Sequence, residues 1–224
     1  MQRYEYFRIN RIFAPKFNVF PPHKTHNKTT FKRNELSILN SQFSILPALR
    51  QGLTLLYPTD TIWGIGCDAT NPDAVERIYA IKQRDHSKSM LILANEQMLS
   101  PHTPSEVLQL LLHSSRPTTV ILPATMLAVP IAQNLPAADG TVGVRIPQFD
   151  FCQQLLHHLG CPLVSTSANL SGHPSPATYA DIDPILKQRI DCCLPDHPSF
   201  HHPATAPSRI VRLLPDGTLT TLRG

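Results

Sequence analysis

The sequence predicts an α/β fold in which helices pack on a twisted, mixed β-sheet. Apolar segments of strand length alternate with amphipathic segments of helical period, and the C-terminal end is rich in strands. The 224 residues, 42% of them apolar, are enough to bury the core of one large domain. No apolar run approaches the roughly 20 residues that a membrane-spanning helix needs, so we expect no membrane span.

The predicted fold begins with a helix over 35–51, where Leu and Phe recur at roughly helical spacing. A strand over 53–57 follows and ends at Pro58. Asn71 and Pro72 then predict the start of a helix, because Asn caps helix N-termini and Pro suits the first helical position. The predicted inner face of that helix consists of Val75, Ile78 and Tyr79.

Three further helices are predicted from signals at their ends. The segment 103–106, T-P-S-E, is typical of a capping box with Pro at the first helical position, and this helix would run through Leu112. A helix over 151–159 would end at Gly160, and a short helix would start at Asp183-Pro184. The other predicted strands are 90–93, 118–122, 141–146, 163–165, 190–194, 208–214 and 218–222, and the turn at 215–217 joins the last two.

The N-terminal segment, residues 1–34, differs from the rest of the chain in its charge. Residues 1–33 hold eight of the 20 Lys and Arg residues and one of the 16 Asp and Glu residues, so the remainder is mildly acidic. Three interpretations stay open: a disordered arm that contacts RNA, a targeting peptide, or the product of an upstream translation start. We favour the last, and we expect a disordered or dispensable extension over 1–34 followed by one domain over 35–224.

The five cysteines are an odd number without regular spacing, which argues against a disulfide framework and fits a reducing cytoplasm. Cys192 and Cys193 precede three histidines, but the spacing matches no standard zinc site. We interpret the pair as strand thiols followed by a loop that carries His, and we leave the identity of any metal open.

The segment 57–61, Y-P-T-D-T, leads from a hydrophobic strand into small hydroxyl and acidic residues, and G-I-G follows at 64–66. α/β folds place ligands in loops at the ends of strands. The alternative is an ordinary turn in which Thr and Asp satisfy local backbone groups.

Two other segments combine groups that bind anions. The cations of 82–84, K-Q-R, follow an amphipathic helix, where they could stabilise the helix dipole or bind phosphate. The segment 165–176, S-T-S-A-N-L-S-G-H-P-S-P, follows a buried strand. Its hydroxyls and successive N–H groups could bind an oxyanion, or they could form a turn rich in Ser and Pro.

Thr141 and Arg145 lie four residues apart on a predicted strand, so they face the same side of the sheet, with Gly143 between them. Gly143 would let a ligand lie against the strand. A buried arginine must find an anion, which could be a structural Asp or Glu or the carboxylate of a substrate.

In combination, P-T-D-T at 58–61, K-Q-R at 82–84, V-G-V-R-I-P at 142–147 and S-T-S-A-N-L-S-G-H-P-S at 165–175 resemble the YrdC-like family, also called TsaC. The resemblance covers about 35–224 and implies a YrdC-like twisted open mixed sheet with flanking helices and a concave, positively charged face. It implies synthesis of L-threonylcarbamoyladenylate from L-threonine, bicarbonate or CO2 and ATP, with release of pyrophosphate. The product would serve N6-threonylcarbamoyladenosine modification of tRNA.

The resemblance also implies roles for individual residues. Lys82 and Arg84 would be the catalytic pair, holding the phosphates of ATP together with Mg2+. The other ATP contacts would be Thr141, Ser167, Asn169 and Ser175, and the threonine contacts would be Thr59, Thr61, Arg145, Ser165 and Ser208. Expected partners are the tRNA-modification proteins that use the adenylate, with weak RNA binding and a cytoplasmic location.

Three segments depart from the pattern of the family. S-S-R-P-T-T at 114–119 stands where many members have W-P-G-P-L-T, K-S-M at 88–90 replaces K-P-L, and Arg209 replaces a small hydroxyl residue. The main alternative function is that of a non-catalytic or differently specific relative of the YciO type, which would bind RNA or nucleotide. Carbamoyl transfer in hydrogenase maturation is a third possibility.

Overall fold

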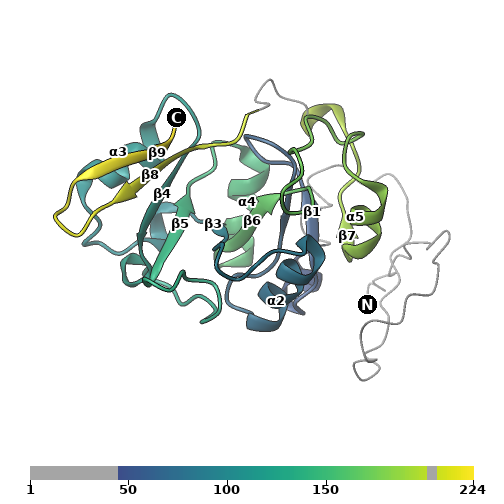
Figure 1. Ribbon diagram of the computed structural model, residues 1–224, viewed down its shortest axis with the longest axis horizontal. Helices are drawn as coiled ribbons and strands as arrows, with labels where there is room; N and C mark the ends of the chain where they lie inside the picture. Colours follow the sequence, from purple (N-terminus) through teal and green to yellow (C-terminus); the bar gives the residue numbers. More distant parts are fainter. Residues whose placement is uncertain (1–44, 201–205) are drawn as a thin grey trace, which may run out of the picture. The chain divides into compact units, whose positions relative to one another are not determined.

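The computed structural model describes residues 45–200 and 206–224 (Figure 1). The predicted extension over 1–34 and the first part of the predicted helix over 35–51 lie outside these ranges. Residues 45–50 are helical, as predicted.

Within the described ranges, nine strands form one sheet in the order β7-β1-β2-β6-β3-β5-β4-β8-β9. Neighbours are parallel in the pairs β1/β7, β3/β5 and β4/β8 and antiparallel in the others, which confirms the predicted mixed sheet. The strands are β1 Leu55–Tyr57, β2 Gly64–Gly66, β3 Leu91–Leu93, β4 Thr118–Pro123, β5 Thr141–Arg145, β6 Leu163–Ser167, β7 Cys192–Cys193, β8 Arg209–Leu213 and β9 Leu219–Arg223.

Four α-helices with defined ends accompany the sheet in the described part of the chain: α2 Pro72–Lys82, α3 Ser105–His113, α4 Asp150–Leu159 and α5 Pro184–Arg189. Figure 1 shows α3 at the β8–β9 end of the sheet and α2 and α5 toward the β1–β7 end. None of the helices in the described ranges is long and apolar enough to cross a membrane.

Helix α2 begins and packs as predicted. The Asn71 side chain accepts hydrogen bonds from the backbone N–H groups of Asp73 and Ala74, at 3.0 and 3.1 Å. Val75, Ile78 and Tyr79 on its inner face are buried. The helix ends where Gln83 adopts a left-handed conformation with φ 50°, which turns the chain from Lys82 toward Arg84.

The predicted capping box of α3 is wrong. The residue at the N-cap is Pro104, so the helix starts at Ser105 and Thr103 lies one position too early to cap it. The buried Thr103 hydroxyl has no hydrogen-bond partner among the described residues. The end of α4 is predicted correctly, because Gly160 closes it in a left-handed conformation with φ 78°.

Strand β2 was not predicted, because its G-I-G sequence was assigned to a loop. It pairs antiparallel with both β1 and β6. A Cβ atom on Gly66 would lie 2.1 Å from the backbone oxygen of Val164, so this pairing requires glycine. Strand β6 extends two residues beyond the predicted 163–165, which brings Ser167 onto the sheet.

Candidate active site

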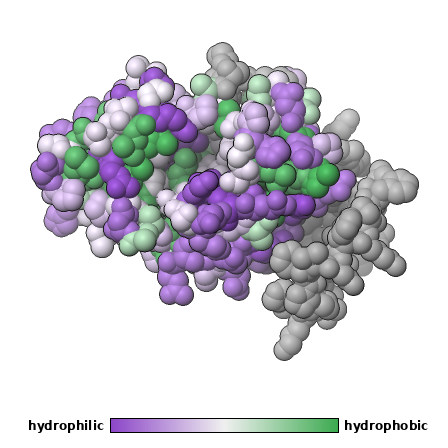
Figure 2. Space-filling model, viewed as in Figure 1, coloured by the Kyte–Doolittle hydropathy of each residue, from purple (hydrophilic) through white to green (hydrophobic). Residues whose placement is uncertain are grey.

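A cavity of about 260 Å3 lies against the sheet. Its walls come from the β1–β2 loop, the segment between α2 and β3, strands β4, β5 and β6, and the C-terminal strands β8 and β9. Figure 2 shows a hollow near the middle of the face that it displays. Eight of the eleven predicted site residues line the cavity: Thr59, Thr61, Arg84, Arg145, Ser165, Ser167, Ser175 and Ser208.

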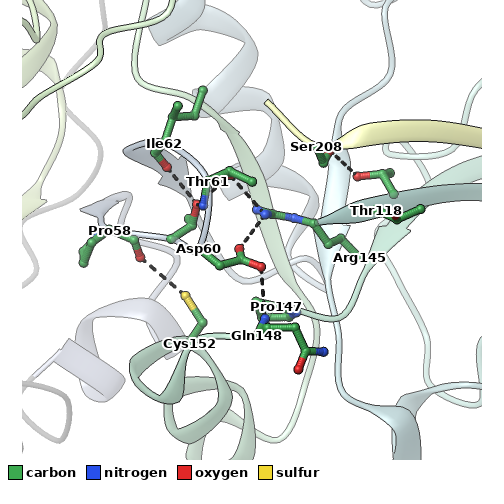
Figure 3. Close-up of polar contacts among 12 residues, drawn as sticks. Pro58, Asp60, Thr61, Ile62, Thr118, Arg145, Pro147, Gln148, Cys152 and Ser208 are labelled. Carbon is green, nitrogen blue, oxygen red and sulfur yellow. Dashed lines mark hydrogen bonds and ion pairs between the residues drawn. The ribbon is translucent and has the colours of Figure 1, made fainter. Parts of the chain in front are cut away.

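Arg145, at the end of β5, is fixed by a buried ion pair (Figure 3). Its Nη1 donates to Asp60 Oδ1 at 2.5 Å, and the two side chains are 4% and 7% exposed. The other carboxylate oxygen of Asp60 accepts a bond from the backbone N–H of Gln148 at 3.0 Å. Arg145 Nε is buried and has no partner among the described residues. The structural acidic partner considered for Arg145 therefore exists, and Arg145 also lines the cavity.

A chain of hydroxyls extends from Arg145 through the β1–β2 loop. Arg145 Nη1 donates to Thr61 Oγ1 at 3.0 Å, and Thr61 Oγ1 lies 2.9 Å from Thr59 Oγ1. Thr59 Oγ1 in turn donates to the carbonyl of Ile62 at 2.8 Å. Because each hydroxyl has one proton, the bond of Thr59 to Ile62 directs the Thr61 proton toward Thr59. This order of donors fixes the directions in which the hydroxyl protons of Thr59 and Thr61 point.

Arg84 supplies a second guanidinium, from the segment after α2. Its Nε donates to the carbonyl of Lys88 at 2.7 Å, and its Nη2 donates to the carbonyl of Ser89 at 2.9 Å. These bonds hold the plane of the half-buried guanidinium group against the segment that carries Arg84. No bond from Nη1 to the described residues competes with a ligand in the cavity.

Lys82 does not line the cavity, although it lies one residue from the segment that does. It is 1% exposed, and its Nζ donates to the carbonyls of Ser167 and Asn169 at 2.5 and 2.6 Å. Burial, and to a smaller degree the positive charge of Arg84, lowers the pKa of Lys82 to about 7. Lys82 thus lies behind the wall of the cavity and ties α2 to the end of β6.

Asn169 and Thr141 are the other two predicted residues outside the cavity lining. Asn169 accepts a hydrogen bond from Ser167 Oγ and donates to the carbonyl of His173 at 2.5 Å, so it shapes the loop that presents Ser167. Thr141 lies at the start of β5, where its hydroxyl donates to Asp139 Oδ1 at 2.6 Å. It shares a face of the strand with Gly143 and Arg145, which both line the cavity.

Three further residues of the site were not predicted: Asp60, Thr119 and Arg223. Asp60 holds Arg145, while Thr119 and Arg223 line the cavity. The Arg223 Nε and Nη2 atoms donate to the carbonyl of Ser208 at 3.1 and 2.7 Å. Asp60 lies in the P-T-D-T segment and Thr119 ends the S-S-R-P-T-T segment, but neither segment indicates these contacts, and no local pattern marks Arg223.

The lining carries the guanidinium groups of Arg84, Arg145 and Arg223 and contains neither Asp nor Glu among the described residues. Burial raises the pKa of the neighbouring Tyr57 hydroxyl and Cys152 thiol far above their usual ranges, so both groups stay protonated at neutral pH. No cluster of three His, Cys, Asp or Glu side chains in the described part of the chain could hold a metal. The arrangement suits an anionic ligand, and neither Tyr57 nor Cys152 supplies it with a deprotonated nucleophile.

Residues 47–224 match the family model named for Sua5, YciO and YrdC, which is described as "Telomere recombination". The chain is 34% identical over 155 residues to the threonylcarbamoyl-AMP synthase of Photobacterium profundum, covering 67% of this chain and 83% of that protein.

The fold matches the H234A/Y235A form of P. abyssi Sua5 with a TM-score of 0.68, 25% identity and coverage of 81% of this chain. It matches P. abyssi Sua5 complexed with L-threonine with a TM-score of 0.67, 24% identity and the same coverage. The chain spans about half the length of these two Sua5 chains, 53% and 54%.

Proposed function

The chain belongs to the Sua5/YciO/YrdC family, and on that basis we propose that it is an L-threonylcarbamoyladenylate synthase. It uses L-threonine, bicarbonate or CO2, and ATP, and it releases pyrophosphate. The observation that carries this proposal is one cavity whose lining, among the described residues, carries arginines and hydroxyls and contains neither Asp nor Glu. The activity named for the P. profundum relative supports it.

The chemistry of the reaction fits a site without a nucleophile. The amine of threonine adds to CO2 and loses one proton to solvent, which gives a carbamate, and one carbamate oxygen then attacks the α-phosphorus of ATP while pyrophosphate leaves. The substrate brings its own nucleophile, so the protein contributes positioning and stabilisation of negative charge. The arginine guanidinium groups, which hydrogen bonds hold in place, and the hydroxyls of the lining supply this positioning and stabilisation.

Threonine binds at the Arg145 end of the cavity in this proposal. Arg145 lines this end of the cavity with its guanidinium held by Asp60 and Thr61, and a guanidinium is a donor for the carboxylate of threonine. Ser165 and Ser208, both buried and both in the lining, complete this end. The solved complex of P. abyssi Sua5 with L-threonine supports the choice of amino acid.

ATP binds at the Arg84 end, where Arg84, Ser167 and Ser175 line the cavity. Lys82 and Asn169 support the loop of Ser167 in the structure. Lys82 Nζ would therefore bind a phosphate only after giving up its hydrogen bond to the carbonyl of Ser167 or of Asn169. The hydroxyl of Thr141 would contact only a nucleotide that extends beyond Gly143 along β5.

Mg2+ accompanies ATP in this proposal as part of the substrate. Mg2+ is commonly held by phosphate oxygens and waters with few protein ligands. Among the described residues, the cavity lining offers hydroxyls such as those of Ser167 and Ser175 but no carboxylate. The adenylate then passes to the proteins that modify tRNA, in the cytoplasm.

The test is release of pyrophosphate from ATP and Mg2+ by the full chain, with and without threonine and bicarbonate. We expect release to require both. Arg84→Gln should raise the KM for ATP at least tenfold, and Arg145→Lys should do the same for threonine, while the exposed Arg189→Gln serves as a matched control without effect. Folded protein that releases no pyrophosphate above background would refute the proposal.

A further inference from the structure

Two buried hydroxyls meet in the cavity wall on the threonine side. Thr119 Oγ1, on β4, lies 2.7 Å from Ser208 Oγ, on the residue before β8. The two residues are 2% and 5% exposed, and both line the cavity. Either oxygen could be the donor in this bond.

The pair has one proton more than its mutual bond uses. Each hydroxyl carries one proton, and the bond between them engages one of the two. Neither hydroxyl makes another hydrogen bond to the described residues. A buried O–H without an acceptor is unfavourable, so the second proton is available to an acceptor oxygen in the cavity, either of water or of a ligand.

The surroundings of Thr119 fix its side chain. A Cβ atom placed on Gly143 would lie 3.2 Å from Thr119 Cγ2, so the methyl group packs against the bare backbone of β5. Because threonine is branched at Cβ, a fixed methyl also fixes the hydroxyl, which then faces Ser208. Ser208 is unbranched, so its side chain has more rotamers open to it, and the contact with Thr119 selects among them.

The backbone of Ser208 is held from the other side. Its carbonyl accepts bonds from Nε and Nη2 of Arg223, and β8 pairs in parallel with β4, with Thr119 opposite Ile210. The backbone of Ser208 is therefore held by the sheet and by Arg223, and the contact with Thr119 Oγ1 is what fixes the position of Ser208 Oγ.

We propose that Thr119 is a positioning residue for Ser208: its hydroxyl donates to Ser208 Oγ and thereby directs the Ser208 proton at an oxygen of the bound amino acid. Thr119 acts through Ser208 and not by touching the ligand itself. The inference rests on the proposed function, because it places the amino acid at this end of the cavity.

Loss of the Thr119 hydroxyl leaves Ser208 free to choose among about three rotamers. We expect Thr119→Val to raise the KM for threonine roughly three- to tenfold, because pre-organisation of the donor is lost. The kcat and the KM for ATP should change less than twofold. Thr119→Ser keeps the hydroxyl and should restore the KM for threonine to within about twofold of wild type.

The experiment is a double-mutant cycle in the pyrophosphate assay, with Thr119→Val, Ser208→Ala and the double variant, and with melting temperatures to confirm folding. If Thr119 acts through Ser208, the double variant has the same KM for threonine as Ser208→Ala alone. Independent effects that multiply in the double variant overturn the inference, as does an unchanged KM in Thr119→Val. A failure of the proposed function is distinct, because wild type itself would then show no threonine-dependent release, and both proposals would fall.

Discussion

Replacing Asp60 with asparagine removes the negative partner of Arg145 while keeping the size of the side chain. In the structure the carboxylate contacts Arg145 Nη1 at 2.5 Å and the backbone N–H of Gln148 at 3.0 Å, with both charged side chains less than a tenth exposed. The asparagine can accept one of these bonds with its amide oxygen, but its NH2 group would face the other donor. The variant thus leaves a buried guanidinium without a counter-charge.

Breaking a buried ion pair by removing one partner costs about 3–5 kcal/mol. The amide oxygen retains one hydrogen bond, so we expect Asp60→Asn to lower the free energy of unfolding by about 3 kcal/mol. In a domain of this size, about 2–4 °C of melting temperature corresponds to each kcal/mol, so the expected fall is roughly 6–12 °C. The KM for threonine should rise as well, because Arg145 loses its fixed orientation.

Urea unfolding followed by tryptophan fluorescence measures this loss directly. Trp63 is the chain's single tryptophan, is 6% exposed and lies three residues from Asp60. Glu76→Gln is the matched control, because it removes a carboxylate whose pair with His86 is 3.3 Å long and more than half exposed. The control should change stability by less than about 1 kcal/mol. An Asp60→Asn variant as stable as that control would refute the view that this ion pair anchors the site.

Three further predictions concern other buried groups. Burial lowers the pKa of Lys82 to about 7, below its value in the unfolded chain, so the free energy of unfolding should rise with pH above 7. Relative to Lys82→Met, wild type should gain between about 1 and 2 kcal/mol in urea unfolding from pH 7 to 8.5, and equal slopes in the two proteins would contradict this. Thr103→Val should raise the stability by about 1 kcal/mol in calorimetry, because it removes a buried hydroxyl without a partner, and any loss would count against that reasoning. Gly66→Ala should lower the melting temperature by several degrees, because its Cβ would strike the Val164 carbonyl. Gly64→Ala is the control and should fold normally, because the contacts of its Cβ would be 3.4 Å or longer. Similar melting temperatures in the two variants would contradict the view that the pairing of β2 requires glycine at position 66.

Elements with a local start or stop signal could be predicted from the sequence. Asn71 caps α2 and Gly160 ends α4 through interactions with their own neighbours in the chain. The prediction of a capping box at Thr103 was wrong because the same sequence motif is compatible with a helix that begins one residue later. Strand β2 could not be predicted, because a three-residue G-I-G segment has no alternation and becomes a strand only between β1 and β6.

The composition of the site was more predictable than its contacts. Recognisable strings contained most of the residues that line the cavity, yet the bond of Arg145 joins it to a residue 85 positions away. The position of Lys82 behind the wall depends on where the carbonyls of Ser167 and Asn169 lie, which no string of letters specifies. Arg223 enters the cavity only because β9 pairs with β8.

The pairing of β9 has a consequence for when the site exists. The cavity takes Thr59 from the first loop of the sheet and Arg223 from its last strand, so a growing chain has no complete wall until β9 has been synthesised and has docked. Strand β9 has one neighbour in the sheet, and such a strand can open at a lower cost than the whole domain. A ligand that contacts Arg223 would make the opening of β9 less favourable, so amide hydrogen exchange in β9 should slow when the cavity is filled. Exchange at this edge strand would therefore measure the occupancy of the cavity.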